Sequence, residues 1–595
     1  MKQLLRRGAA LGLALLMTAG AATAGASDAL GWEIHRGRVP LSQGTGFEKT
    51  LFWSDTYADL RAEYYIEYTP NPSVVPTVAY GERILAKATL TSMAEGLESL
   101  GKHVVSGING DWYVVSTGAP TGLVLTGGVV RSTPYYNTAW AVGFNSDGTA
   151  FIGRPGLNIS VSFGGQARRL GGGINKIRKL VSGDASGGLT LLTSDFSAMT
   201  QNTQPGVDVI LTPMDDGTGY SLEPRIGSMT RYVVEQVLES EGSIPIPEGK
   251  AVLTLNSSDN AEILEELRAL QPGDPVVLTI GTADLRWTGV DQALGGVDKI
   301  VTAGQVENGL PSDRTACTAV GVRSDGSVVL YTLDGRQSGY SVGATMTQVA
   351  QRLVELGCVD AISMDGGGST NLGVTWPGQS SLQIVGRPSD GSQRANSTAI
   401  FLTTRMETTG NLSSYYVTPT DAMLLAGSTL QLSAAGLDSA FYPTSGGYVD
   451  WSVPEGGGSI NSGGLFTAGS ESGFSVVSAS DGWGNGSAYI TTVKTPDSIS
   501  VLNEATGAAV SALNLDPGEQ LDLTASAVYR KLALVAQDTS FVWSTDVPGS
   551  SVDANGVFTA GEEGASGSLT VSAGGASATV PVRVASHVYP LDVCE

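Results

Sequence analysis

An internal repeat in the C-terminal part of the chain constrains the fold more than any other feature. The pattern W-S, followed by G-x-F-T-A-G, occurs twice, and the second copy is displaced by 92 residues. The copies are Trp451-Ser452 with Leu465–Gly469, and Trp543-Ser544 with Val557–Gly561. Two copies of about 90 residues, each with short alternating runs between Gly, Ser and Asp turns, predict two all-β sandwiches at residues 405–494 and 495–595.

These repeats resemble bacterial immunoglobulin-like domains, which share the same W-S and G-x-F-T-A-G pattern. The resemblance implies modules that bind carbohydrate or attach the protein to the cell envelope. A spacer that carries the rest of the chain away from a surface is the simpler alternative, because a fold by itself does not specify a function.

Charge and histidine content exclude several classes of function. The chain has 34 basic and 57 acidic residues, a net charge of −23, which opposes binding to nucleic acid or anionic lipid. Histidine occurs only at His35, His103 and His587, so a three-histidine zinc site would consume every one. The HExxH motif is absent. Carboxylates, Arg, Asn, Tyr and backbone amides remain as the catalytic inventory.

The N-terminus has the three parts of a secretory signal peptide, which we assign to residues 1–26. Lys2, Arg6 and Arg7 form a basic start, the apolar run 9–17 is too short to span a bilayer, and small residues follow. No later apolar run approaches 18 residues, so no transmembrane segment is expected. The sequence therefore predicts a protein that is secreted or associated with the cell envelope.

Residues 27–404 contain two helix–strand units that align without a gap. A capping box at Thr345 and Gln348 predicts the start of the later helix, and Gly357 predicts its end. Equivalent positions lie 256 residues apart, including Leu97 and Leu353, Gly101 and Gly357, Asn109 and Asp365, and Gly110 and Gly366. Each strand is expected to deliver a polar residue and a glycine at its C-terminal end, where ligands bind in α/β sheets. Common helix-stop chemistry is the alternative.

Three further polar segments lie near these units. A β-hairpin turning at Asp325-Gly326 is followed by Asp334-Gly335-Arg336, and a third set is Arg387–Gly391. Arginine suits phosphate because its planar fork donates two parallel hydrogen bonds. The triple glycine 366–368 lets backbone amides approach an anion closely, but the GxxxxGK[ST] pattern of a nucleotide P-loop is absent.

Taken together, the ordered motifs between residues 60 and 404 resemble the phosphodiester glycosidase family, which includes a vertebrate N-acetylglucosamine-1-phosphodiester α-N-acetylglucosaminidase. The motifs are Ile108–Tyr113, Asn175 with Arg178, Ala293–Gly296, Arg314–Ala316, Asp334–Arg336, Asp365–Ser369 and Arg387–Gly391. The resemblance implies cleavage of a glycosyl–phosphate bond. We therefore expect a multidomain protein: an α+β domain at 27–404, with mixed sheets, packed helices and a β-rich start to about residue 85, followed by the two sandwiches.

The family chemistry needs a carboxylate near the anomeric carbon and cations at the phosphate. We expect Asp365 to be the first catalytic candidate, followed by Asp334, Asp111 and Asp390. For each carboxylate, a purely structural turn role is the alternative. The expected substrate-binding residues are Asn109, Gly110, Arg178, Arg314, Arg336, Gly366, Gly367, Gly368, Ser369 and Arg387.

The cysteines give one further prediction. Cys317 lies on the first hairpin strand and Cys358 opens the strand that leads to Asp365, so a disulfide between them is expected if those strands are neighbours. Two buried thiols are the alternative, and Cys594 has no expected partner.

The interpretation is an exported glycosidase that acts on sugar-1-phosphodiesters in envelope or extracellular glycans, with no cofactor expected. Two alternatives stay open. One is a non-catalytic protein that binds or adheres to envelope glycans. The other is a metal-dependent phosphodiesterase with an all-oxygen calcium or magnesium site.

Overall fold

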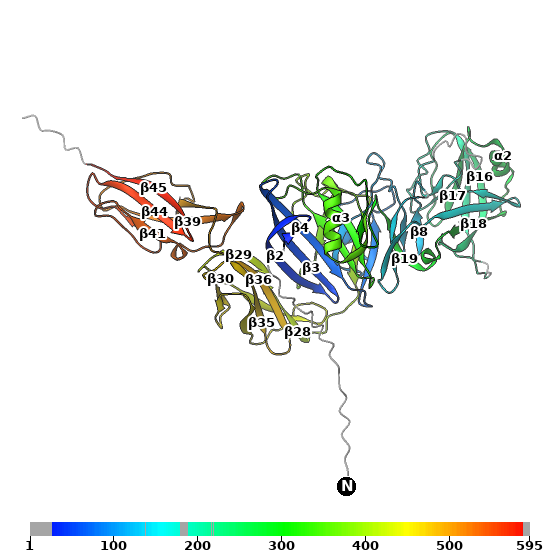
Figure 1. The fold of residues 1–595 in the computed structure, drawn as a ribbon. Coiled ribbons are helices and arrows are strands. Elements are labelled where there is room, and N and C mark those ends of the chain that lie inside the picture. Colours follow the sequence, from blue (N-terminus) through cyan, green and yellow to red (C-terminus); the bar gives the residue numbers. More distant parts are fainter. Residues whose placement is uncertain (1–25, 137, 179–187, 216, 218, 587–595) are drawn as a thin grey trace, which may run out of the picture.

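The computed structural model describes residues 26–136, 138–178, 188–215, 217 and 219–586, and β-strands are the main regular structure among them. The segment assigned as a signal peptide, apart from Ala26, lies outside the described residues, as does Cys594. Within the described part of the chain, no helix is both long and apolar enough to cross a membrane. The chain is thus a strand-rich, multidomain protein (Figure 1).

The central module is built in layers around two facing sheets. The first sheet has the order β1 (Ala26–Ser27), β2 (Gly31–Ser42), β3 (Thr45–Ser54), β4 (Asp59–Tyr68), β23 (Val328–Leu333), β22 (Cys317–Arg323), β24 (Cys358–Ser363), β20 (Lys299–Thr302), β21 (Gln305–Val306). The second has the order β26 (Gln383–Val385), β25 (Leu372–Val374), β6 (His103–Asn109), β27 (Thr398–Thr404), β5 (Val74–Tyr80). The paired strands within both sheets are antiparallel, and one apolar core contains residues of both.

A helix covers the outer face of each sheet. Helix α3 (Met346–Glu355) buries Val349, Ala350 and Leu353 against the first sheet. Helix α1 (Leu90–Ser99) buries Leu90, Met93, Ala94 and Leu97 against the second. Figure 1 shows α3 beside the blue strands of the first sheet.

The two helix–strand units are equivalent in detail. Both helices begin after an N-cap threonine, Thr89 or Thr345, whose side chain accepts a hydrogen bond from a backbone N–H of the first turn. The capping box expected at Thr345 and Gln348 is present. Gly101 (φ 74°) and Gly357 (φ 84°) then end the helices in the left-handed conformation. Strands β6 and β24 follow at once, each in a different one of the two facing sheets.

A smaller sheet links this module to an inserted lobe. Its order is β10 (Ala150–Gly153), β9 (Ala141–Asn145), β19 (Val290–Gly295), β7 (Val124–Thr126), β8 (Val129–Ser132). The lobe leaves after β10 and returns before β19. Its sheet has the order β12 (Gln166–Arg169), β11 (Leu157–Phe163), β18 (Pro275–Thr282), β16 (Ser228–Ser240), β15 (Gly206–Pro213), β17 (Ala251–Asn256), β14 (Thr190–Thr193), β13 (Gly173–Ile174).

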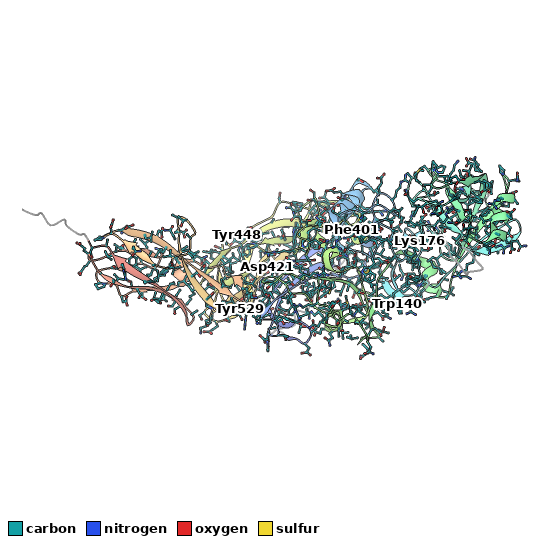
Figure 2. All side chains as sticks on the ribbon, turned by 90° about the horizontal axis from the view of Figure 1, so that it is seen from above. Trp140, Lys176, Phe401, Asp421, Tyr448 and Tyr529 are labelled. Carbon is teal, nitrogen blue, oxygen red and sulfur yellow. The ribbon has the colours of Figure 1, made fainter. Side chains whose placement is uncertain are left out.

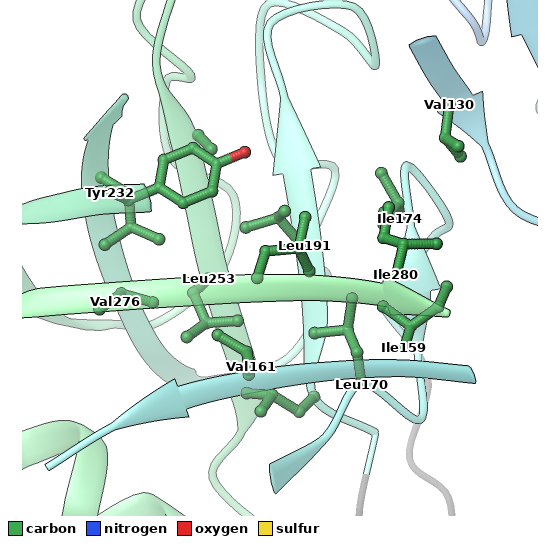
Figure 3. Packing of buried hydrophobic residues seen from close by; sticks show 14 of the residues in the cluster. Val130, Ile159, Val161, Leu170, Ile174, Leu191, Tyr232, Leu253, Val276 and Ile280 are labelled. Atoms are coloured by element: carbon green, nitrogen blue, oxygen red, sulfur yellow. The ribbon is translucent and has the colours of Figure 1, made fainter. Parts of the chain in front are cut away.

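The inserted lobe has a core of its own, which includes residues of helix α2 (Ala261–Ala269). Figure 3 shows part of this core, in which Ile174 is the labelled residue of the lobe nearest to Val130 of β8. The core therefore continues from the lobe into the linking sheet. The sequence patterns did not distinguish this lobe from the rest of residues 27–404.

Two β modules follow the central module. After β27 ends at Thr404, the first comprises β28 (Leu412–Thr418), β29 (Asp421–Leu425), β30 (Thr429–Gln431), β31 (Ser433–Asp438), β32 (Asp450–Glu455), β33 (Ser459–Ile460), β34 (Leu465–Thr467), β35 (Gly473–Ser480) and β36 (Asn485–Val493). The second comprises β37 (Ser498–Asn503), β38 (Leu513–Leu515), β39 (Gln520–Tyr529), β40 (Leu532–Ala533), β41 (Val542–Thr545), β42 (Ser551–Val552), β43 (Val557–Thr559), β44 (Ser566–Ala573) and β45 (Ala576–Val584).

Both modules contact the central module through charged side chains. Asp421 of β29 accepts a hydrogen bond from Lys49 at 3.0 Å and lies 3.7 Å from His35 (Figure 2). Gly37 permits this approach, because a Cβ atom there would meet the Asp421 carboxylate. From the second module, Lys531 lies 2.9 Å from Asp59. Figure 1 places this second module and the inserted lobe at opposite ends of the molecule.

The expected disulfide is wrong. Cys317 and Cys358 are both buried free thiols, although their strands are neighbours. The strands are antiparallel, and Cys358 lies opposite Arg323, at the far end of β22 from Cys317. Six residues of strand separate the two positions by roughly 20 Å, far beyond the Cα separation that a disulfide permits.

Candidate active site

The C-terminal ends of β6 and β24 meet between the two sheets. Asn109 Nδ2 donates a hydrogen bond to the backbone oxygen of Asp365 at 2.7 Å, and the Asp365 amide donates to the Gly110 oxygen at 3.0 Å. Residues 256 positions apart therefore bind each other directly. Asn109 Oδ1 also accepts hydrogen bonds from Thr318 Oγ1 and the Asn371 amide. Asn109 is 1% exposed, and its hydrogen bonds join the ends of the two strands. These protein contacts occupy the side chain that the sequence analysis expected to bind substrate.

The triple glycine after β24 makes room for two guanidinium groups. Gly367 (φ 61°) opens the short 3-10 helix η2 (Gly367–Ser369), and a Cβ atom there would lie 2.9 Å from both Nη atoms of Arg336. A Cβ atom on Gly368 would collide with the Arg394–Asp390 pair. The glycines thus let two arginine side chains approach the backbone beside Asp365.

Asp365 is the half-buried carboxylate of this cluster. Burial raises the pKa of Asp365, and the Ser369 side chain and the charge of Arg394 act in the opposite direction. Arg394 donates to Ser369 Oγ at 3.3 Å and to Asp390 Oδ2 at 2.6 Å. The Trp112 side chain, which lies beside the Asp365 carboxylate, is 52% exposed. Asp365 therefore combines partial solvent access with neighbouring cations.

Asp334 ties together the loops that carry Arg336 and Arg387. Its Oδ2 accepts hydrogen bonds from the Arg387 amide and from Tyr340 Oη, both at 2.7 Å. Gln337, next to Arg336, donates to the Arg387 oxygen at 2.8 Å. Burial raises the pKa of Asp334 to about 6, against the hydrogen bonds that it accepts. The exposed Arg387 guanidinium lies 4.2 Å from the centre of the Tyr340 ring.

Asp111, in the segment that follows β6, is buried and enclosed by hydrogen-bond donors of the protein. It is 2% exposed and accepts hydrogen bonds from the Trp112 and Gly122 amides at 2.7 and 2.6 Å and from Thr121 Oγ1 at 3.2 Å. Burial raises the pKa of Asp111 to about 6 in spite of these bonds and of the charge of Lys176. This geometry fits the structural turn role that was the alternative for each carboxylate.

The remaining expected residues divide between the site and other places. Arg314 is exposed, 3.9 Å from the centre of the Tyr57 ring, in the segment that also contains Ala316, whose oxygen binds the Gly367 amide. Asp390 is paired with Arg394. Arg178 is a correction: it is buried in the inserted lobe, where it donates to Thr254 Oγ1 and to backbone oxygens. Its 3.9 Å approach to buried Asp208 makes it a structural cation.

Sequence reasoning assigned no role to Arg394 or to Lys176. Arg394 carries a usable signal, because it follows the Arg387–Gly391 motif closely. Lys176 lies within the motif that contains Asn175 and Arg178, but no local pattern shows which of these side chains points away from the lobe. Among the described residues, no cluster of three or more His, Cys, Asp or Glu side chains is arranged to hold a metal ion.

Comparison with known proteins gives one family match. Residues 226–403 match the family model of phosphodiester glycosidases. This range contains the Arg314, Asp334–Arg336, Asp365–Ser369 and Arg387–Gly391 motifs and ends just before the end of β27. No curated protein matches the chain.

Three solved structures of low sequence identity are similar to parts of the chain. A hypothetical protein from Synechocystis is 17% identical, with 61% of this chain and 62% of that one covered and a TM-score of 0.46. The chain thus spans less than two thirds of that protein. A Burkholderia pseudomallei protein named as exported is 18% identical, covering 58% and 74%, TM-score 0.42. The zebrafish N-acetylglucosamine-1-phosphodiester α-N-acetylglucosaminidase catalytic domain, auto-inhibited by its pro-peptide, is 14% identical, covering 62% and 88%, TM-score 0.28.

Proposed function

We propose that the protein is a glycosidase that hydrolyses the glycosyl–phosphate bond of sugar-1-phosphodiesters in envelope or extracellular glycans. The family match over residues 226–403 supports a glycosidase of this class. The observation that carries the proposal is the cluster at the Gly366–Gly368 turn. There, the half-buried Asp365 carboxylate lies near the Arg394 guanidinium, and the Arg336 guanidinium packs against Gly367, two residues further along the chain.

This cluster suits a reaction with a phosphate leaving group. Cleavage of the bond between the anomeric carbon and the bridging oxygen leaves negative charge on a phosphomonoester, and nearby cations stabilise that charge in the transition state. Arg336 supplies such a cation. Arg387 supplies another, because its loop is hydrogen-bonded to the loop that carries Arg336. A carboxylate on the sugar side serves as the base for water or as the nucleophile. Asp365 fills this role because it is partly accessible, whereas Asp111 and Asp334 are closed by protein hydrogen bonds and the exposed Asp390 is paired with Arg394.

Hydrolysis in ¹⁸O-labelled water tests the proposal directly. The substrate is a GlcNAc-1-phosphodiester, and the products are separated and analysed by mass spectrometry. Attack at carbon places the label on the anomeric hydroxyl of the sugar. Label in the phosphate would instead indicate a phosphodiesterase that breaks the P–O bond, and a chelator would then show whether that activity needs a metal. Absence of turnover with a range of sugar-1-phosphodiesters would favour a glycan-binding protein.

The proposal includes where the enzyme works. We infer that residues 1–26 direct export and that the two C-terminal β modules hold the enzyme at the cell envelope or space it from that surface. The signal-like pattern at the N-terminus and the repeat in the C-terminal part support this inference. Pulldown of the isolated residues 405–595 with envelope polysaccharide distinguishes attachment from spacing.

A further inference from the structure

A pocket of about 280 Å³ lies at the junction of the central module and the first β module. The central module contributes the start of β6 and the loop after β25, which includes Trp376 and Gln379. The first β module contributes the turn 440–443 between β31 and β32. Figure 1 shows β29 and β36 of this module beside β2 of the central one. The volume is near the lower end of the range for small-molecule sites, about 300–1,000 Å³, so it suits a ligand the size of one sugar ring.

The pocket is separate from the reaction centre. Strand β6 starts at His103, which lines the pocket, and ends at Asn109, which is bound to Asp365. Six residue steps of extended strand correspond to roughly 20 Å. A ligand in the pocket therefore lies at the end of β6 that is opposite to the Asp365 carboxylate.

The turn from the first β module is held in place by the buried Asp438. Its Oδ1 accepts hydrogen bonds from the Ala440 and Tyr442 amides at 2.9 and 3.0 Å. Its Oδ2 accepts hydrogen bonds from the Thr409 and Gly410 amides at 2.6 and 3.1 Å, in the segment that joins the two modules. One carboxylate thus fixes the turn relative to the connection between the modules, so this wall of the pocket is preformed.

Phe441 occupies a backbone position in this turn that favours glycine. Its φ is 66°, and among the described residues it is the only aromatic one with a positive φ. A residue with a Cβ atom is strained in this conformation, and such strain concentrates at ligand sites. The turn therefore keeps an aromatic side chain where glycine would be less strained, and Phe441 lines the pocket.

Two further aromatic residues, Trp376 and Tyr442, line the pocket with Phe441. The Trp376 ring is fixed edge-to-face against Phe47, with 5.2 Å between the ring centroids. The Tyr442 ring lies nearly perpendicular to the His103 ring, with 6.3 Å between the centroids. Rigid aromatic rings present apolar faces, and the C–H groups on one face of a pyranose can stack on them.

The charges in the pocket are already engaged by the protein. Among its lining residues, all of which the structure describes, Glu98 and His103 are the only ones that are charged or titrate near neutral pH. Glu98 Oε2 accepts a hydrogen bond from His103 Nδ1 at 3.0 Å, and Oε1 accepts one from the Val104 amide at 2.6 Å. Gln379 and Ser380 add neutral hydrogen-bonding groups at the exposed rim. This lining suits an uncharged ligand with an apolar face and a rim of hydroxyl groups.

We propose that this pocket binds one uncharged pyranose unit of a glycan, which stacks on the aromatic residues and donates hydroxyl hydrogen bonds at the rim. The proposal goes beyond the proposed function, because the pocket holds glycan at a distance from the bond that is cleaved and needs no hydrolysis. It also gives the first β module a direct part in glycan binding, since this module supplies one wall.

Ligand-observed NMR titration tests the proposal on the full chain, because both modules supply walls of the pocket. The neutral probes are the methyl glycosides of glucose, galactose, mannose and N-acetylglucosamine, and the charged probes are methyl glucuronide and choline. At least one neutral glycoside should bind. Both charged probes should bind at least about fivefold more weakly than the best neutral one, because each would bury a charge without a partner.

Two variants alter the pocket and leave the reaction centre intact. Tyr442→Ala should weaken binding of the best neutral glycoside roughly three- to tenfold, through loss of one stacking contact. Phe441→Gly should weaken it by a similar factor without lowering the melting temperature, because glycine relieves the strained φ. If the Phe441 ring only joined the two modules, this variant would lower the melting temperature and leave the affinity unchanged. Phe441→Gly also keeps the test valid if Tyr442→Ala fails to fold.

Two controls locate the site. Trp483 is 95% exposed on the same module and lies outside the pocket, so Trp483→Ala should bind every probe as the wild type does. Asp365→Asn should also keep the affinity for the neutral glycoside, because the pocket is separate from the reaction centre.

The proposal is overturned if no neutral glycoside binds, or if methyl glucuronide or choline binds as tightly as the best of them. Unchanged affinity in both pocket variants, or loss of binding in either control, would also overturn it. Failure of the proposed function is a separate result, because it would appear as absent hydrolysis of sugar-1-phosphodiesters while the binding data stay as described.

Discussion

Substitution of Gly367 by alanine tests whether the glycine turn positions Arg336. The new Cβ atom would lie 2.9 Å from both Nη atoms, so the guanidinium must move away. The φ of 61° adds backbone strain of about 1–2 kcal/mol for an L-residue, which lowers the free energy of unfolding by that amount. Loss of a charge-assisted contact to phosphate is worth about 1.5–3 kcal/mol, so kcat/KM for a phosphodiester should fall roughly 10- to 150-fold.

The matched control is Gly304→Ala in the turn between β20 and β21. Gly304 has a φ of 75° with open space around its Cβ position, so the strain is the same and no neighbour is displaced. The assay compares kcat/KM for a GlcNAc-1-phosphodiester and for an aryl α-GlcNAc, with unfolding followed in urea. In an Arg336→Ala background, Gly367→Ala should have little further effect on kcat/KM. Additive losses, or equal losses on both substrates, would refute the reasoning.

Four other expectations concern single groups. Asp365→Asn should lower kcat at least about 100-fold with thermal melting unchanged, and near wild-type turnover would move the catalytic role elsewhere. Arg387→Ala should reduce kcat/KM for phosphodiesters by roughly tenfold or more and for aryl glycosides far less; parallel losses would indicate a structural role. Burial raises the pKa of Asp111 from 3.8 to about 6, so the folded state keeps a proton that the unfolded state releases. The bound proton stabilises the folded state at low pH, and this contribution to the free energy of unfolding is lost as pH rises from about 4 to 6. Asp111→Asn should therefore gain about 3 kcal/mol relative to wild type between pH 4 and 7 in urea unfolding, and a pH-independent difference would contradict the assignment. Because Cys317 and Cys358 are distant free thiols, a reductant should leave the melting temperature of the protein unchanged.

Local patterns predicted the local structure well. The capping box, the helix-ending glycines and the hairpin after Cys317 depend on residues close in the chain, and each is present where expected. The displacement of 256 residues also identified Asn109 and Asp365 as equivalent strand ends. Their direct hydrogen bond could not be predicted, because it depends on how two different sheets face each other.

The misplaced residues share one cause. Arg178 was expected at the phosphate because it belongs to a family motif, yet its strand neighbours place it inside a lobe whose existence no local pattern indicates. The cysteine pairing failed for a similar reason: adjacency of strands was correct, but the antiparallel register put the thiols at opposite ends. Sequence periodicity determines which face a side chain occupies, whereas long-range register determines its neighbours.

The position of β27 has a consequence for how the enzyme is made. This strand, the last of the central module, lies between β5 and β6, and its residue Thr404 pairs with Val74. At typical rates of synthesis, roughly 15–60 s pass between the synthesis of β6 and that of β27, the strand that pairs with both β5 and β6. Contacts of such long range also slow folding once the chain is complete. Asn109 at the end of β6 cannot be locked in place before then, so assembly of the reaction centre is one of the last steps in the folding of the module.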